Sequence, residues 1–238
     1  MKTVAIIQAR MGSTRLPGKV MKDLCGKTVL AHVIERVRVG CDNIVIATTD
    51  NSQDEAIIAE ARKNGAEVFR GSEDDVLSRY YLAAKAAKAD LVVRVTSDCP
   101  LYDGKLLADM LKYYKGEDYL SNTIERRFPR GLDTEIFTFA ALEKAHRMAN
   151  EQYQREHVTP YIYQNPEKFK IRLFKRQPNL SDMRWTLDTE EDWQMILAVY
   201  NHLYKGRIFS TVEVVKFLAK HPEIAKINAH IEQKKLNE

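Results

Sequence analysis

A chain of 238 residues is long enough to bury a large hydrophobic core in one α/β domain. With 45% hydrophobic and 29% charged residues, ten glycines and seven prolines, it leaves little room for disordered tails or linkers. The net charge is +4, and the basic residues are interleaved with acidic ones, which argues against a nucleic-acid partner. No apolar run reaches the length of a signal peptide or a membrane span. Cys25, Cys41 and Cys99 form no CxxC pattern, which favours reduced thiols in the cytoplasm.

Strand and helix patterns alternate through the first half of the chain, which predicts βαβ units and a parallel sheet. We expect buried strands at 4–7, 43–48, 66–69, 91–95 and 118–122. Helices are predicted between them, at 29–39, 52–63, 75–89 and 103–115. Ser52, with Glu55 three positions later, predicts a capping box at the start of the second helix.

The pattern changes after Thr123, where a basic and irregular stretch begins. The remaining sequence predicts strands at 132–139, 170–174 and 185–188, the last as a strand of the main sheet, and helices at 140–150, 153–163, 190–204 and 211–220. We interpret residues 1–238 as one domain, in which about 123–165 form an insertion.

The first loop combines positive charge with small residues. It follows the apolar run at 4–7 and carries Arg10, Gly12, Ser13, Thr14, Arg15, Gly18 and Lys19. Glycines let backbone N–H groups approach an anion, and Arg and Lys neutralise phosphates. Because the loop lies between a strand and a helix, at the sheet edge where α/β proteins bind ligands, we predict a polyphosphate site. A solvated basic loop is the alternative, and a Walker loop is absent because Val20 follows Gly18-Lys19.

Two aspartates stand where a predicted strand ends. Asp98 follows the strand at 91–95, and a carboxylate that faces a triphosphate favours an intervening Mg²⁺. Its alternative is a turn or helix cap, for which Asp103 is the better candidate. On the residues alone, Asp188 or Thr189 is better explained as a cap of the following helix.

Several sequence blocks resemble the cytidylyltransferases that make CMP-Kdo and CMP-sialic acids, and in particular their spore coat polysaccharide (SpsF-like) branch. The blocks span most of the chain and read QARMGSTRLPGK (8–19), RGSEDDVLSRYY (70–81), RVTSDCPL (94–101), PRGLDTEIF (129–137), REHVTPYIY (155–163) and RWTLDTEEDW (184–193).

The resemblance implies a three-layer, mostly parallel twisted sheet of the nucleotide-diphospho-sugar transferase (Rossmann-like) fold, with a small inserted dimerisation and sugar-binding segment. Together with the aromatic content of 123–165, it also implies a homodimer. It further implies a catalytic set of Arg10, Lys19, Asp98 and Asp188, with Asp98 and Asp188 holding Mg²⁺, and CTP binding by Gln8, Ala9, Arg10, Gly12, Ser13, Arg15, Lys19, Asp75 and Arg79. Thr186 departs from the pattern, because sialic-acid members often have aspartate there.

The implied reaction is attack of a sugar hydroxyl on the α-phosphate of CTP, with pyrophosphate as the leaving group. An Arg fork suits the carboxylate of an acidic sugar, and Asp, Glu and His suit its hydroxyls. We therefore expect the sugar site among Arg130, Asp133, Glu135, Arg155, Glu156, His157 and Tyr161. For Asp75 and Arg79, a first-turn acid and its partner on the same helix are an equal alternative.

The sequence leaves two alternative functions to consider. A metal-dependent glycosyltransferase would carry a compact D-x-D, and Asp98-Cys99-Pro100 breaks that spacing. A catalytically silent nucleotide-binding protein would not need the intact set of Arg10, Lys19, Asp98 and Asp188.

Overall fold

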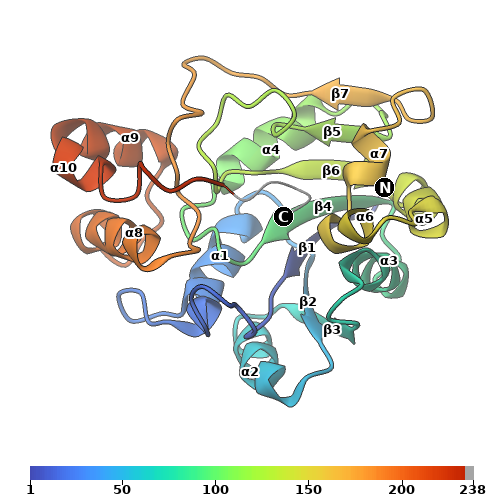
Figure 1. Cartoon of the computed structure of the whole chain (residues 1–238), viewed down its shortest axis with the longest axis horizontal. Coiled ribbons are helices and arrows are strands. Elements are labelled where there is room, and N and C mark those ends of the chain that lie inside the picture. Colours follow the sequence, from blue (N-terminus) through green and yellow to red (C-terminus); the bar gives the residue numbers. More distant parts are fainter. Residues whose placement is uncertain (234–238) are drawn as a thin grey trace.

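The computed structural model describes residues 1–233 and builds them around a single seven-stranded sheet (Figure 1). The strands lie in the order β3-β2-β1-β4-β6-β5-β7. Their bounds are β1 Thr3–Gln8, β2 Ile44–Thr49, β3 Glu67–Gly71, β4 Leu91–Thr96, β5 Tyr119–Ser121, β6 Glu135–Thr138 and β7 Ile171–Leu173.

The strand β6 runs against its neighbours. β1 pairs in parallel with β2 and β4, and β2 with β3, whereas β6 is antiparallel to both β4 and β5. β5 and β7 are again parallel to each other. Because β6 belongs to the segment 123–165, part of that segment lies inside the main sheet.

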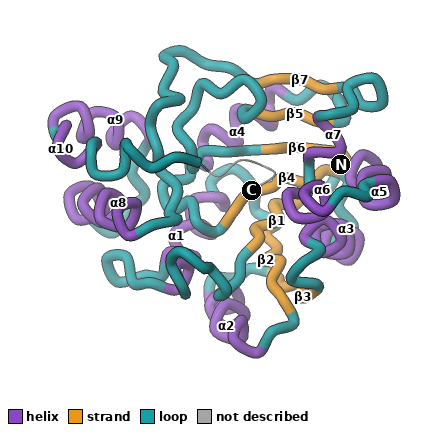
Figure 2. The backbone as a smooth tube through the Cα atoms, in the orientation of Figure 1, coloured by secondary structure: helices purple, strands orange, loops and turns teal. Residues whose placement is uncertain are grey.

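Helices cover both faces of the sheet (Figure 2). Their bounds are α1 Val29–Arg38, α2 Glu55–Lys63, α3 Val76–Ala86, α4 Gly104–Tyr113, α5 Phe139–Met148, α6 Gln152–His157, α7 Pro160–Tyr163, α8 Glu190–Leu203, α9 Thr211–Lys220 and α10 Pro222–Ala225, with short 3₁₀ turns η1 Lys19–Met21 and η2 Ser52–Asp54. Buried side chains of α1, α2, α4, α8 and α9 share one core, and those of α3, α5 and α7 share the other. This is the three-layer, mostly parallel α/β fold that the sequence predicts.

The central strand β1 shows why its sequence is apolar without interruption. Ala5 and Ile7 face the core of α1 and α8, whereas Val4 and Ile6 face the core of α3 and α5. All four are essentially inaccessible to solvent. A strand that is covered on both faces has no polar side, and its sequence therefore reads as a continuous hydrophobic run.

The strand predicted at 185–188 is wrong. Arg184 makes only an isolated bridge with Arg130. Beyond it, the backbone N–H of Trp185 donates to the Arg130 carbonyl at 2.7 Å, and that of Leu187 donates to the Asp98 carbonyl at 2.8 Å. The segment is extended but bonds to two separate loops in turn, so no continuous ladder with a strand forms.

Two helix predictions also need correction. Ser52 begins the turn η2 and makes no capping box, because Glu55 forms an ion pair with Arg70 instead. The helix predicted at 153–163 is two helices, α6 and α7, which are separated at Val158, where φ is 74°. Pro160 begins α7 and has no N–H with which to continue the preceding helix.

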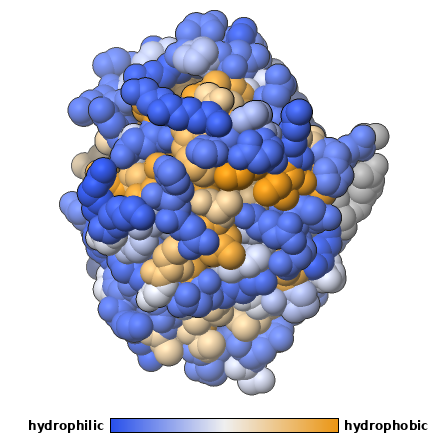
Figure 3. Space-filling view, turned by 90° about the vertical axis from the view of Figure 1, so that its left-hand side faces the viewer, coloured by the Kyte–Doolittle hydropathy of each residue, from blue (hydrophilic) through white to orange (hydrophobic). Residues whose placement is uncertain are grey.

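The side of the molecule that carries α8, α9 and α10 is largely hydrophilic, with apolar areas between the charged side chains (Figure 3). Across residues 1–233, no helix is both long and apolar enough to span a bilayer. Cys25, Cys41 and Cys99 are free thiols.

Candidate active site

A cleft of about 830 Å³ opens at the carboxyl end of β4. Because β6 runs opposite to β4, the residues that precede β6 reach the same edge. The lining comes from the loop after β1, the second half of β4 and the residues after it, the approach to β6, α6 with the residue before it, the segment before α8, and a residue that follows α10: Arg15, Arg94, Val95, Thr96, Asp98, Cys99, Arg130, Gly131, Asp133, Glu151, Gln152, Tyr153, Glu156, His157, Thr186, Asp188 and Gln233. Open α/β sheets bind their ligands at this edge.

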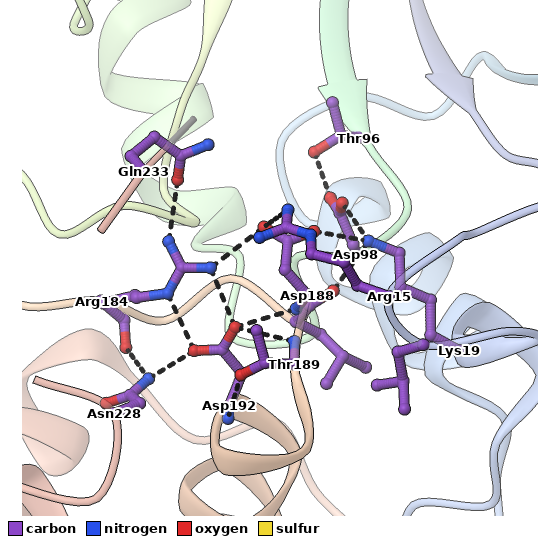
Figure 4. A network of polar contacts seen from close by, with 12 residues as sticks. Arg15, Lys19, Thr96, Asp98, Arg184, Asp188, Thr189, Asp192, Asn228 and Gln233 are labelled. Atoms are coloured by element: carbon purple, nitrogen blue, oxygen red, sulfur yellow. Dashed lines mark hydrogen bonds and ion pairs between the residues drawn. The ribbon is translucent and has the colours of Figure 1, made fainter. Parts of the chain in front are cut away.

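Lys19 joins the first loop to two distant carboxylates (Figure 4). Its Nζ donates to Asp98 Oδ2 at 2.8 Å, to Asp188 Oδ1 at 2.7 Å and to the Leu187 carbonyl oxygen at 2.8 Å. Burial opposes the charged form, but the charges of Asp98 and Asp188 outweigh it and raise the pKa of Lys19. Two aspartates from distant parts of the sequence therefore converge on one ammonium group.

Asp98 is fixed from two sides. The Thr96 hydroxyl donates to Oδ1 at 2.6 Å, while Lys19 holds Oδ2. Burial alone would raise the pKa of Asp98, but the Lys19 charge and the hydrogen bonds from Lys19 and Thr96 lower it to about 2. The group is therefore ionised at neutral pH. The predicted capping role of Asp103 is confirmed, because its carboxylate accepts from the backbone N–H groups of Lys105 and Leu106.

Asp188 is held by two arginines. Arg15 Nη2 lies 3.3 Å from its Oδ2, and Arg184 Nη2 donates to the same oxygen at 3.1 Å. The cap of α8 is Thr189, whose hydroxyl accepts from the Asp192 N–H at 3.3 Å. Because Thr189 makes that cap, the carboxylate of Asp188 remains directed to Lys19 and the cleft.

Behind Asp188 lies a buried pair that the sequence did not indicate. Arg184 Nε donates to Asp192 Oδ1 at 2.9 Å, and the Asn228 amide donates to the same oxygen at 2.8 Å. Burial opposes ionisation of Asp192, but the contacts with Arg184 and Asn228 outweigh it and lower its pKa. This pair fixes the guanidinium that holds Asp188, so Arg184 is a positioning residue for the site.

The loop after β1 is anchored by a carboxylate of η2. Asp54 is fully buried and accepts hydrogen bonds from the Met11 N–H at 2.8 Å and from the hydroxyls of Thr48 and Thr49. The left-handed turn at Gly18, with φ 67°, then directs the chain into η1, where Lys19 lies.

The other residues predicted to bind the nucleotide are spread along the same edge. Arg10 pairs with Glu73 at 3.0 Å and is about half exposed. Gln8 ends β1, and its Oε1 is buried with no hydrogen-bond partner among residues 1–233. Ala9 is buried, whereas Gly12 and Ser13 lie in the loop and are partly accessible.

Asp75 and Arg79 hold the backbone and the neighbouring helix in place. Asp75 caps α3 by accepting from the Ser78 N–H at 2.9 Å, and it pairs with Arg155 of α6. Arg79 is buried and donates to the Ser72 carbonyl. The side chains of Asp75 and Arg79 therefore do not pair with each other on α3, which was the alternative to nucleotide binding.

The residues predicted for the sugar site divide into two groups. Arg130, Asp133, Glu156 and His157 line the cleft. Glu135, Arg155 and Tyr161 do not: Glu135 is buried in the sheet, Arg155 turns to Asp75, and Tyr161 packs against Phe169.

Arg130 differs from the other cations of the cleft. Within residues 1–233, its guanidinium has no ion-pair or hydrogen-bond partner, whereas Arg126 pairs with Asp133 beside it. Burial, followed by the charge of Arg126, lowers the pKa of Arg130. A partly buried cation without a counter-ion is a candidate for binding an anionic group.

Arg94 is a further cleft residue that the sequence did not single out. It pairs with Glu135 on the neighbouring strand β6, and the hydroxyls of Tyr119 and Thr159 also donate to Glu135. The Nε of Arg94 is buried without a hydrogen-bond partner among the described residues. Arg94 and Glu135 therefore form a largely buried ion pair within the sheet, and Arg94 lines the cleft.

The donor chemistry fits a divalent cation that arrives with phosphates. Residues 1–233 contain no group of three or more His, Cys, Asp and Glu side chains that could hold a metal. Asp98, Asp188 and the Leu187 carbonyl nevertheless offer three oxygens directed at one point. Mg²⁺ binds through one or two carboxylates and takes its other ligands from water and phosphate oxygens. The residues present therefore fit Mg²⁺, for which Asp98 and Asp188 would be the carboxylate ligands.

Comparison with known proteins places the chain in a family. A family model described as cytidylyltransferase matches residues 4–215. The chain is 40% identical to an uncharacterised protein of Methanocaldococcus jannaschii, over 100% of this chain and 99% of that protein. It is 36% identical to the spore coat polysaccharide biosynthesis protein SpsF of Bacillus subtilis, over 92% of this chain and 95% of that protein.

A solved structure supports the same family assignment. A cytidylyltransferase from Leptospira borgpetersenii superposes with a TM-score of 0.91 at 38% identity, covering 99% of this chain and 100% of that one. The matched family region contains Lys19, Asp98 and Asp188, whose side chains meet at the edge of the cleft. From its sequence, its fold and these relatives, the chain belongs to the cytidylyltransferase family.

Proposed function

We propose that this protein transfers CMP from CTP to an acidic sugar and releases pyrophosphate, in the biosynthesis of a surface or spore-coat polysaccharide. The observation that carries this proposal is the convergence of Lys19, Asp98 and Asp188 at the end of β4. There, cations that can hold phosphates lie against carboxylates that can hold a metal ion. The similarity to SpsF supports the polysaccharide pathway.

In this reaction, the sugar hydroxyl loses its proton to water, its oxygen forms a bond to the α-phosphorus, and the bond from that phosphorus to the pyrophosphate oxygen breaks. Arg10, Arg15 and Lys19 bind the β- and γ-phosphates and neutralise the leaving group. Asp98 and Asp188 would hold Mg²⁺, which supplies charge neutralisation at the α-phosphate and acidifies the attacking hydroxyl. Positioning and charge neutralisation account for most of the catalysis in such a transfer.

The acid group of the sugar is assigned to Arg130, because this cation lines the cleft and has no counter-ion among residues 1–233. Asp133 and Glu156 lie in the same lining and can accept hydrogen bonds from sugar hydroxyls. The resemblance of the sequence blocks to the CMP-Kdo enzymes also favours an acidic sugar.

The test incubates purified protein and Mg²⁺ with each nucleoside triphosphate and a panel of acidic sugars, and follows pyrophosphate release. The matched control for each sugar is an analogue in which the carboxylate is replaced by a neutral group. We expect release with CTP and an acidic sugar, little release with the neutral analogue, and tighter calorimetric binding of CTP than of UTP or GTP. Tighter binding of UTP or GTP, or no release with any acidic sugar, would contradict the proposal.

We also propose a homodimer that forms through the segment 123–165. Two large hydrophobic side chains of this segment, Ile124 and Met148, are 43% and 53% exposed. The chain mass is 27.4 kDa, so light scattering at micromolar concentration should give twice this value. A monomeric mass, or a dimer unaffected by Met148→Glu and Ile124→Glu, would count against this interface.

A further inference from the structure

The ammonium of Lys19 occupies a site that is built for a cation. Three oxygens surround its Nζ: one each from Asp98 and Asp188 and the carbonyl oxygen of Leu187, at 2.7–2.8 Å. Its three N–H donors are therefore all used. The side chain is 11% exposed, so water takes little part in this cage. Carboxylate and carbonyl oxygens are also the ligands that hard divalent cations prefer.

The cage is electrically balanced. Ion pairs join Asp98, Asp188 and Asp192 to Lys19, Arg15 and Arg184, so that three carboxylates face three cations. A divalent cation that approaches this network meets no uncompensated negative charge. It also meets an ammonium at the point where the oxygens converge, and the two cations cannot share that point.

We propose that Lys19 is a displaceable occupant of the metal site, and that a divalent cation binds firmly there only after phosphates have drawn Lys19 away. The inference rests on the part of the proposed function that gives Asp98 and Asp188 to a divalent cation. The inference adds an order of binding. The nucleotide phosphates first draw Lys19 out of the site, and the divalent cation then binds there.

The exchange leaves no buried charge unpaired. Lys19 moves from two carboxylates to phosphate oxygens, and the cation takes its place between Asp98 and Asp188. Removing one partner from a buried pair is costly, whereas exchanging partners avoids that cost. The lysine stem has four rotatable carbons, and Lys19 follows the left-handed turn at Gly18 at the start of the short turn η1, so the side chain can swing without unfolding a long helix.

Titration with Mn²⁺ alone, followed by electron paramagnetic resonance of free Mn²⁺, tests the inference without nucleotide, sugar or activity. Lys19→Met removes the ammonium and keeps the length of the side chain. We expect wild-type protein to bind Mn²⁺ weakly and Lys19→Met to bind it at least about tenfold more tightly. Mn²⁺ should also raise the Tm of Lys19→Met more than that of wild type.

The control is Lys22→Met, since Lys22 belongs to the same loop and lies 3.7 Å from Glu190 rather than in the cage. It should bind Mn²⁺ as wild type does, and adding Asp98→Asn to Lys19→Met should abolish the gain. If Lys19→Met does not fold, Lys19→Gln is measured instead, because its amide is neutral and can still donate to a carboxylate.

Equal Mn²⁺ affinity of wild type and the Lys19 variant would overturn the inference, and so would an equal gain in Lys22→Met. These outcomes are independent of the transfer reaction. Mg²⁺-dependent pyrophosphate release could persist when the inference fails, and the Mn²⁺ gain could persist when no sugar is accepted.

Discussion

In the proposed function, the cleft has a phosphate half around Lys19 and an acceptor half around Arg130, and the chain builds the two differently. In the phosphate half, Lys19, Asp98 and Asp188 come from distant parts of the sequence and pair with one another. In the acceptor half, Arg130 lines the cleft without an ion pair among residues 1–233. The first half is organised by its own charges before any ligand arrives, whereas the second leaves a charge for the ligand to neutralise.

This difference explains why one half is easier to recognise than the other. The ion pairs of Lys19 require definite residues at definite positions, and these residues lie in the sequence blocks that resemble the cytidylyltransferases. An open surface with one unpaired cation suits many anionic sugars and does not identify any of them. Substitutions can therefore disturb one half and leave the other intact.

The largest effect should follow loss of a carboxylate in the phosphate half. Asp98→Asn and Asp188→Asn should each lower the rate of pyrophosphate release roughly a hundredfold or more, because the metal ion loses a charged ligand. Calorimetry without metal should still show CTP binding. Asp103→Asn is the control: Asp103 caps α4, and Asn caps as well as Asp. An active Asp188→Asn protein with unchanged Mg²⁺ dependence would remove Asp188 from the metal site.

Arg130→Met should weaken the acceptor half alone. Losing a charge-assisted contact of about 1.5–3 kcal/mol should raise the KM for the acidic sugar about ten- to a hundredfold. The KM for CTP should not change. Arg127→Met is the control, because Arg127 lies in the same loop and is not part of the cleft lining. A raised KM for CTP instead would place Arg130 in the phosphate half.

Asp54→Asn should loosen the support of the phosphate loop. Burial would raise the pKa of Asp54, but hydrogen bonds from Thr49 and the Met11 N–H outweigh it and lower the pKa. A lowered carboxyl pKa stabilises the fold above the ordinary value of 3.8, and this contribution is lost as pH falls below it. Urea unfolding should show a loss of roughly 1–3 kcal/mol at pH 7 and a smaller loss at pH 3. Equal losses at both pH values would contradict this role.

Arg10→Ala should have the smallest effect. Arg10 is about half exposed and pairs with Glu73 on the surface, so its contact with a phosphate is screened by water. We expect calorimetric CTP binding to weaken by about 1.5 kcal/mol or less. Arg62→Ala, an exposed change on α2, is the control. A loss of about 3 kcal/mol or more would show that Arg10 moves into the cleft when CTP binds.

Much of the fold could be predicted because strands covered on both faces are continuous apolar runs, as in β1. The segment 185–188 has the burial of such a strand, because Trp185, Thr186, Leu187 and Asp188 are all buried. Its backbone, however, bonds to Arg130 and then to Asp98. The burial of side chains does not identify the hydrogen-bond partner of the backbone.

The site residues were predicted less well than the strands, because local sequence does not show which partner a polar side chain contacts. Asp192 fits the role of a first-turn acid in α8, so nothing local indicated that it pairs with Arg184. Arg155 and Glu156 are adjacent, yet Arg155 reaches Asp75 and only Glu156 lines the cleft. Tertiary packing decides which polar residues of a short helix face a cleft. A high density of polar residues in the sequence does not reveal which ones they are.

The reversed strand β6 gives the acceptor half a particular freedom to vary. β5 ends and β6 begins at the same edge of the sheet, so residues 122–134 leave the sheet beside the cleft and return to it there. This connection carries both Arg130 and Asp133, and its tip at Ile124 and Glu125 is exposed. Exposed loop tips accept insertions and exchanges more readily than strands do. Relatives could therefore acquire new acceptor sugars by altering one connection, while the strand order and the charge cluster around Lys19 stay as they are.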